Sequence, residues 1–186
     1  MAVGRRMTRR HVALIRGINV GRAKRVAMAD LRALVGDLGY GEVRTLLNSG
    51  NVVFTVPASA RSDPAPRIEQ AMTARLGISA RVTVLTAAEL AAVIAENPLG
   101  DLATDPSRLL VTVLTNPADR KRLHPLARQD WAPDVLAVGA RVAYLWCPRG
   151  MLESRLAEAV SRLLGAAATT RNWTTMTKLN ALVGES

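Results

Sequence analysis

The first half of the chain contains the segment Val43-Arg44-Thr45-Leu46-Leu47-Asn48-Ser49-Gly50-Asn51-Val52-Val53-Phe54-Thr55-Val56. Two β-leaning runs, 43–47 and 52–56, are separated here by four residues of turn-forming type. Asn and Gly accept left-handed backbone conformations, and Asn and Ser side chains stabilise tight turns. The segment therefore predicts a β-hairpin with its tip at residues 48–51.

Helical patterns flank this hairpin on both sides. Apolar residues recur at i, i+3, i+4 and i+7 from Leu31 to Leu38, and Gly39 supplies a left-handed stop. The elements predicted for this half are a strand over 11–15, a helix over 28–38, the two hairpin strands, a helix from the Pro-rich stretch 62–66 to Gly77, and a strand over 80–85. Strand, helix, strand, strand, helix, strand is the order of a ferredoxin-like unit.

The same order returns in the second half of the chain. Thr86 and Glu89 form a capping box that begins a connecting helix, and Asn97-Pro98 ends it. The elements predicted after it are a strand over 109–114, a helix over 119–129, strands over 135–138 and 141–147 around a Gly139-Ala140 turn, a helix ending at Gly165, a short strand over 166–170, and a C-terminal helix with Met176, Leu179 and Val183 inward.

The predicted fold class is therefore α+β, with two ferredoxin-like βαββαβ subdomains, antiparallel sheets and a C-terminal helix. We expect residues 1–10 to be a basic, disordered N-terminal segment. The first subdomain and the connecting helix are expected over 11–97, and the second subdomain and the C-terminal helix over 98–186.

The formal net charge of +10 over 186 residues arises near the N-terminus. Eight of the 25 basic residues precede the first acid, Asp30, which leaves 17 basic residues against 15 acidic ones. Cys147 is the single cysteine, which excludes an intrachain disulfide, and no apolar run approaches the roughly 18 residues of a membrane span. We expect a cytoplasmic protein with no membrane partner.

Polar residues concentrate at two places that this topology brings together. In a ferredoxin-like sheet the first two strands run in the same direction, so the loop 16–27 and the hairpin tip should lie side by side. The loop carries two glycines and four cations and leads into a helix N-terminus, a combination that favours an anion. The predicted ligand-binding residues are Arg16, Asn19, Arg22, Lys24, Arg25, Asn48, Ser49 and Asn51, with Arg171, Asn172 and Lys178 as a second wall. The alternative is an ordinary loop with solvated arginines beside an ordinary turn.

Three stretches of the sequence resemble the signature of a bacterial family known as domain of unknown function 1697. The resemblance rests on Ala13-Leu14-Ile15-Arg16-Gly17-Ile18-Asn19-Val20-Gly21, Ser49-Gly50-Asn51-Val52-Val53-Phe54 and Thr169-Thr170-Arg171-Asn172-Trp173-Thr174-Thr175. It implies a small α+β protein with ferredoxin-like subdomains. It brings no activity, substrate or cofactor with it.

The favoured hypothesis is a binder, with or without enzymatic activity, of a small phosphate- or carboxylate-bearing ligand. Nucleic-acid binding through the basic N-terminal segment is an alternative, weakened because Phe54 is the one aromatic in the first unit's strands. A second alternative is a protein-interaction module with a basic edge. Ser49 lacks a G-x-S-x-G context and the two histidines form no metal-ligand cluster, so no catalytic residue, metal site, cofactor or oligomeric state is predicted.

Overall fold

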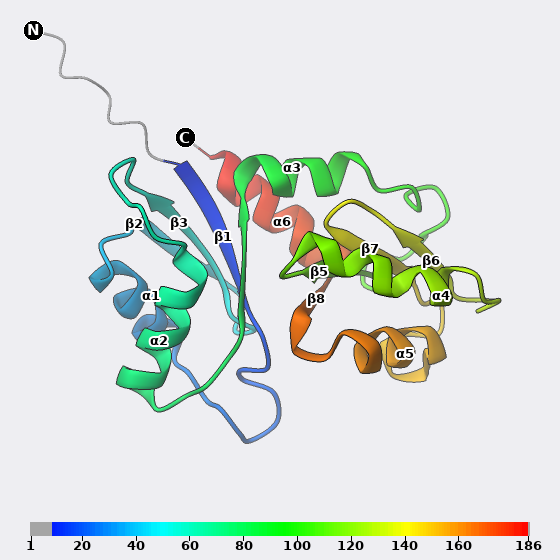
Figure 1. The fold of residues 1–186 in the computed structure, drawn as a ribbon, viewed down its shortest axis with the longest axis horizontal. Coiled ribbons are helices and arrows are strands. Elements are labelled where there is room, and N and C mark those ends of the chain that lie inside the picture. Colours follow the sequence, from blue (N-terminus) through cyan, green and yellow to red (C-terminus); the bar gives the residue numbers. More distant parts are fainter. Residues whose placement is uncertain (1–8, 186) are drawn as a thin grey trace, which may run out of the picture. The chain divides into compact units, whose positions relative to one another are not determined.

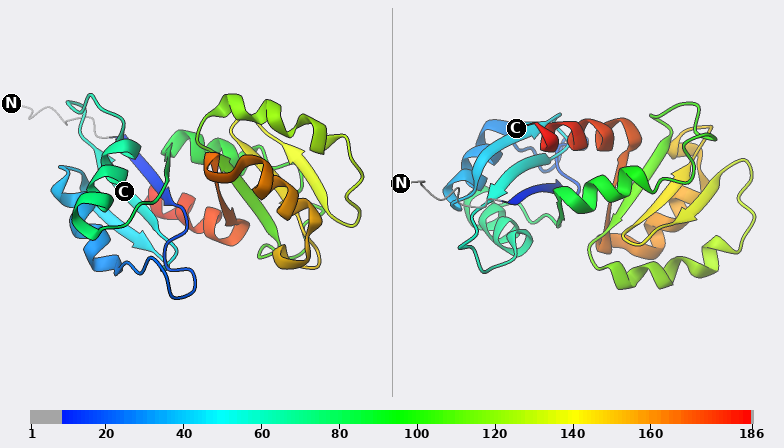
Figure 2. Two further views of the ribbon diagram at one scale, coloured as in Figure 1. Left: turned by 60° about the horizontal axis from the view of Figure 1, so that its bottom comes forward. Right: turned by 90° about the horizontal axis from the view of Figure 1, so that it is seen from above.

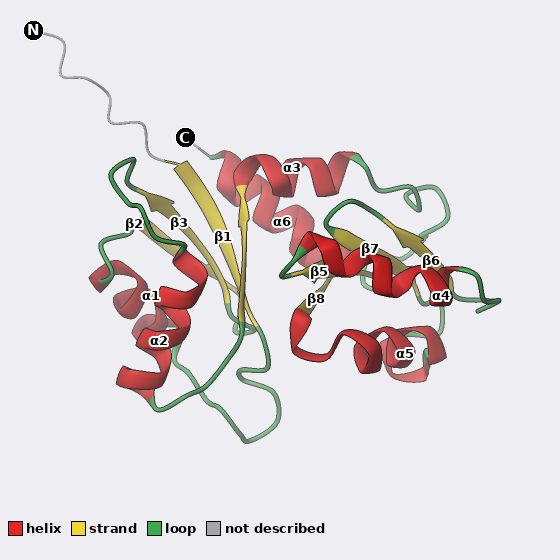
Figure 3. Ribbon diagram, viewed as in Figure 1, coloured by secondary structure: helices red, strands yellow, loops and turns green. Residues whose placement is uncertain are grey.

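The computed structural model describes residues 9–185 and confirms the α+β class (Figures 1 and 3). The chain divides into two compact units, of which the first comprises the described residues up to Glu89 together with those from Ala181 on. The second unit is residues 90–180. The division falls within two helices, α3 (Ala87–Ala95) and α6 (Trp173–Gly184), whereas the sequence analysis placed it in the loop after Asn97.

The first unit has the expected strand-helix-strand-strand-helix-strand order. Its elements are β1 (Arg9–Ile15), α1 (Met28–Asp37), β2 (Gly41–Leu46), β3 (Asn51–Val56), α2 (Pro64–Leu76) and β4 (Val82–Thr86). The strands form an antiparallel sheet in the order β2-β3-β1-β4, with Val12 opposite Val53 on one side and Leu85 on the other. Because β1 and β2 are both antiparallel to β3, their carboxyl ends lie at the same edge of the sheet.

One face of this sheet is covered by α1 and α2 (Figure 3). Strand residues two apart point to the same face, so Val52, Phe54 and Val56 all pack into this core. The helices contribute the apolar stripes that the periodicity predicted, namely Leu31, Leu34, Val35, Ile68 and Met72. Gly39 and Gly77 have φ values of 88° and 64°, which confirms them as left-handed helix stops.

The first strand begins earlier than expected. Arg9 and Arg10, assigned to the N-terminal segment from sequence, are the first residues of β1 and pair with Val56 and Thr55 of β3. The rest of the predicted disordered segment, residues 1–8, lies outside the described residues.

The second unit repeats the topology of the first. Its elements are β5 (Leu109–Leu114), the 3₁₀ helix η1 (Pro117–Leu123), α4 (His124–Ala127), β6 (Val135–Val138), β7 (Val142–Trp146), η2 (Met151–Glu153), α5 (Arg155–Leu164), η3 (Gly165–Ala167) and β8 (Ala168–Asn172). The antiparallel sheet order β6-β7-β5-β8 matches that of the first unit position by position. Leu156 and Val160 of α5 and Leu123 of η1 belong to one core with the sheet residues Leu110, Ala143 and Leu145. Figure 2 shows the ribbon of this unit from two further sides.

The helix predicted over 119–129 is wrong in type and length. Residues 117–123 form a 3₁₀ helix that begins at Asn116, whose side chain accepts a hydrogen bond from the Ala118 N-H at 3.0 Å. Pro125 has no N-H and cannot continue an α-helical hydrogen-bond ladder from this segment, so a separate short helix, α4, starts here with Pro125 in its first turn.

The predicted capping box at the start of α3 is confirmed. The Thr86 N-H donates to Glu89 Oε2 at 2.8 Å, and the Glu89 N-H donates to Thr86 Oγ1 at 3.1 Å. The last strand is shifted from the prediction, since residues 165–167 form η3 and β8 occupies 168–172.

Candidate functional site

The loop between β1 and α1 has an unusual backbone. Four of its residues, Gly17, Asn19, Gly21 and Lys24, have positive φ values between 52° and 71°. Such values suit glycine and are tolerated by Asn, but they are uncommon for Lys. Contacts that fix the rest of the loop must therefore offset the cost of holding Lys24 in this conformation.

Asn19 closes the loop through its side chain. Its Oδ1 accepts a hydrogen bond from the Val26 N-H at 2.8 Å, and its Nδ2 donates to the Val26 carbonyl at 2.9 Å. The Asn19 N-H also donates to the Lys24 carbonyl at 3.0 Å. The amide thus pairs with Val26 as a neighbouring strand would, and it holds the two ends of residues 20–25 together.

The same side chain joins the loop to the hairpin tip. Asn19 Nδ2 donates to the Asn48 carbonyl oxygen at 2.7 Å. This bond confirms the expectation that the loop 16–27 and the tip 48–51 lie side by side, although 29 residues separate the two partners in sequence.

The side chain of Asn51 stabilises the hairpin tip by hydrogen bonds. It is fully buried, and its Nδ2 donates to the Leu46 carbonyl at 2.9 Å and to Ser49 Oγ at 2.8 Å. Gly50 has φ of 83°, and a Cβ at this position would lie 2.8 Å from Ile18 Cδ1. Asn51 and Gly50 therefore shape the tip, and Asn48 and Ser49 are its exposed residues.

Three cations are exposed on the closed loop. Arg22 and Arg25 make no hydrogen bond or ion pair with any residue of 9–185, and Lys24 Nζ donates to the Ser79 carbonyl at 3.0 Å. Arg16 is half-buried, and its N-H donates to the Arg81 carbonyl at 2.8 Å. The loop is therefore a fixed segment with several positive charges directed to solvent.

Two exposed apolar side chains accompany these cations. Val20 on the loop is 71% exposed and Leu47 at the tip is 54% exposed. The sequence does not predict either as exposed, because Val and Leu beside β-strands are normally core residues. No signal in the chain marks them as exposed.

The three residues predicted as a second wall belong to the second unit. Asn172 Oδ1 accepts a hydrogen bond from the Thr175 N-H at 2.9 Å, so this side chain caps the start of α6. Burial lowers the pKa of the Arg171 guanidinium to about 10, and its Nη1 donates to the Thr170 carbonyl at 3.0 Å. Lys178 is exposed on α6. That these residues contribute to the same site as the loop stays a prediction.

The thiol of Cys147 is a packed side chain. Its Sγ lies 3.3 Å from Ser154 Oγ, and that hydroxyl donates to Asp134 Oδ2 at 2.7 Å and caps α5 by accepting from the Ala157 N-H. Burial raises the pKa of the Cys147 thiol, an effect that the hydrogen bond between Cys147 and Ser154 opposes. The thiolate, which is the reactive form, is therefore disfavoured here.

Residues 9–185 form no metal-binding cluster, and the two sheets expose no aromatic side chain for stacking. No group of three or more His, Cys, Asp or Glu side chains within this range is placed to hold a metal ion. The aromatic residues of the strands, Phe54, Tyr144 and Trp146, are all buried. Within the same part of the chain, no helix combines the length and apolarity needed to cross a membrane.

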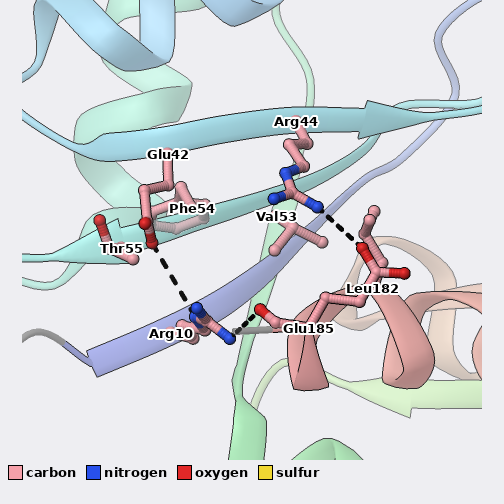
Figure 4. Close-up of a pocket in the computed structure, with 8 residues that line it drawn as sticks. All are labelled: Arg10, Glu42, Arg44, Val53, Phe54, Thr55, Leu182 and Glu185. Carbon is pink, nitrogen blue, oxygen red and sulfur yellow. Dashed lines mark hydrogen bonds and ion pairs between the residues drawn. The ribbon is translucent and has the colours of Figure 1, made fainter.

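A small hollow on the other face of the first sheet is filled by charged contacts (Figure 4). Arg10 Nη1 donates to the Val183 carbonyl at 3.0 Å and also contacts the Glu185 carbonyl, while Arg44 pairs with the Glu185 carboxylate at 2.9 Å. Its volume of about 10 Å³ is near the minimum for one water molecule. These contacts fasten the end of α6 to the first unit and leave no room for a ligand.

The fold and the loop together define a class of protein. It has two ferredoxin-like α+β units, each with sheet order 2-3-1-4, and a cationic loop closed by an asparagine at one sheet edge. The chain belongs to the family described as "Protein of unknown function (DUF1697)", whose model matches residues 7–144.

A solved structure has the same fold. The conserved bacterial protein SP0830 from Streptococcus pneumoniae superposes with a TM-score of 0.79 over 95% of this chain and 99% of that chain, at 21% sequence identity. At this identity the likeness establishes the fold alone. The comparison with curated proteins finds no match.

Proposed function

We propose that the protein binds a small anionic ligand, bearing phosphate or carboxylate, at the loop 16–27 beside the hairpin tip. The observation that supports the proposal is the group of exposed cations Arg22, Lys24 and Arg25 on a loop held closed by Asn19. Neither arginine has a carboxylate partner within residues 9–185.

Clustered like charges on a fixed loop repel one another, and an anion relieves that repulsion. The Asn19 contacts already fix the loop, so a ligand would not have to order it on binding. The nearby start of α1 adds to the attraction, since its N-cap residue Ala27 offers no side-chain hydrogen bond to the free N-H groups of the first turn.

The predicted site residues take two different parts in this proposal. Asn19 and Asn51 position the loop and the tip, because their amides are engaged with the protein's own backbone. Arg22, Lys24 and Arg25 would contact the anion directly, and the exposed tip residues Asn48 and Ser49 would supply polar contacts beside them.

Phosphate titration tests this assignment. Isothermal titration calorimetry with inorganic phosphate, at constant ionic strength, should give an affinity at least tenfold weaker for the double variant Arg22→Gln/Arg25→Gln, since a hydrogen bond to a charged group contributes about 1.5–3 kcal/mol. The matched control is Arg61→Gln/Arg120→Gln, which removes the same charge from two exposed arginines elsewhere. Equal weakening in both variants would show that phosphate senses net charge and not the loop.

The exposed apolar pair Val20 and Leu47 favours a second candidate, a surface that binds an acidic protein partner. The double variant Val20→Ser/Leu47→Ser separates this candidate from the small-anion site, because it should leave phosphate affinity within about twofold of wild type if the site recognises a small anion.

The nucleic-acid alternative depends on residues 1–10, most of which lie outside the described residues. Titration of a labelled oligonucleotide against salt tests it directly.

A further inference from the structure

A separate cavity of about 170 Å³, open to solvent, lies at the surface of the second unit. Asp130, Trp131 and Asp134 line it from the segment before β6, and Arg149, Glu153 and Arg155 line it from the segment that runs from the end of β7 to the first residue of α5. The volume far exceeds the roughly 10–15 Å³ that admits one water molecule, and it is below the roughly 300 Å³ at which pockets for drug-sized ligands begin. A molecule of the size of an amino acid fits this range.

The wall formed by residues 130–134 is fixed by hydrogen bonds. Trp131 Nε1 donates to the Leu126 carbonyl at 2.8 Å, and the Asp134 N-H donates to the Trp131 carbonyl at 2.9 Å. Asp130 Oδ1 accepts from the Ala132 N-H at 3.0 Å. The indole face and the two carboxylates are thus set in place without a ligand.

The second wall is tied to the first at its base. Ser154 Oγ donates to Asp134 Oδ2 at 2.7 Å, and the same hydroxyl caps α5, the helix that Arg155 begins. This places the positively polarised N-terminus of a ten-residue helix beside the two arginines of the cavity.

The charges of the cavity do not neutralise one another. Elsewhere in the chain carboxylates pair with arginines, as Asp37 does with Arg75 at 2.8 Å. The three carboxylates and two guanidinium groups of the cavity line a single space, yet none forms an ion pair within 4.0 Å with any residue of 9–185. Carboxylates and guanidinium groups therefore line the same small volume without forming ion pairs with one another.

We propose that this cavity binds a free α-amino acid. A simple anion would form ion pairs with the two arginines alone, and a simple cation would form them with the carboxylates alone. An α-amino acid carries both charges on adjacent atoms, so its carboxylate pairs with Arg149 and Arg155 while its ammonium lies near Asp130 and Asp134. Trp131 supplies an apolar wall for the side chain.

The net charge of the cavity also predicts which amino acids bind most tightly. Three carboxylates against two guanidinium groups give the cavity a net charge of −1. Amino acids with a basic side chain therefore bind more tightly than those with an acidic side chain, because the extra positive charge is attracted and an extra negative one repelled.

Nuclear magnetic resonance of ¹⁵N-labelled protein tests the proposal through the Trp131 indole N-H. Each of the standard L-amino acids is added at about 5 mM, enough to occupy most of a site with Kd of about 1 mM. A shift of the Trp131 indole signal with lysine or arginine, larger than with aspartate or glutamate, is expected. If none of the amino acids moves this signal, the proposal is overturned.

Ligand analogues and variants sharpen the result. The methyl ester of the best amino acid lacks the carboxylate and its α-hydroxy acid lacks the ammonium, so each should bind about tenfold more weakly. Arg155→Gln and Asp130→Asn should weaken binding to a similar degree, whereas Arg162→Gln, on the same helix but outside the cavity, should change it less than about twofold. Unaltered affinity for both analogues, or equal weakening by Arg162→Gln, would overturn the assignment.

Discussion

Replacing Asn19 by alanine should lower the free energy of unfolding by about 3–4 kcal/mol. The substitution removes two hydrogen bonds to the buried backbone of Val26 and one to the Asn48 carbonyl. Each buried bond contributes about 1–1.5 kcal/mol, and the exposed one contributes less. Alanine must in addition adopt φ of 55°, which costs about 1 kcal/mol that asparagine largely avoids.

Urea unfolding at equilibrium, followed by circular dichroism, measures this loss. Asn48→Ala is the matched control, because Asn48 accepts the bond through its backbone carbonyl and that bond survives the substitution. Asn19→Gly should cost about 1 kcal/mol less than Asn19→Ala, since glycine accepts the left-handed backbone. The reasoning is refuted if Asn19→Ala costs no more than Asn48→Ala.

Other substitutions probe the tip, the core and the buried thiol. Gly50→Ala should destabilise the protein by about 2–3 kcal/mol in the same unfolding assay, because its Cβ would collide with Ile18. Gly36→Ala, in the last turn of α1 where a Cβ meets open space, should stabilise it by up to about 0.5 kcal/mol. Burial raises the pKa of Tyr144 to about 12, so the neutral phenol's stability contribution is complete below the ordinary value of about 10 and is lost as the pH rises towards 12. Tyr144→Phe should flatten the loss of stability measured by urea unfolding across that window, and an unchanged slope would contradict the assignment. Cys147 should resist iodoacetamide in the folded protein and react fully in denaturant, and rapid labelling of the native state would show that the thiol is accessible.

Much of the fold could be predicted because local chemistry and tertiary structure agree. The hairpin turn at 48–51 and the stops at Gly39 and Gly77 need left-handed residues, and the chain supplies them where needed. The helix predicted over 119–129 failed because apolar spacing does not distinguish a 3₁₀ turn from an α-turn. The missing N-H of Pro125 interrupts the ladder.

The candidate site was only partly predictable, for a different reason. Strand order alone brought the loop 16–27 beside the hairpin tip, and the Asn19 bond to Asn48 confirms it. Whether an asparagine binds a ligand or the protein's own backbone depends on where Val26 lies, which no sequence pattern shows. The cavity beside Trp131 could not be predicted from the sequence, because its charges come from two separate segments, 130–134 and 149–155, whose polar composition is typical of ordinary turns and helix starts.

The closure at Asn19 also affects how this protein can change over evolutionary time. Its contacts reach Lys24 and Val26 through their backbone atoms, so the identities of residues 20–23 carry no part of the closure. Substitutions at Val20, Arg22 and Ala23 are therefore neutral for folding, whereas Gly21, with φ of 61°, favours glycine. Homologues can alter the charge or bulk of these three positions, and with them the choice of ligand, while inheriting the same scaffold.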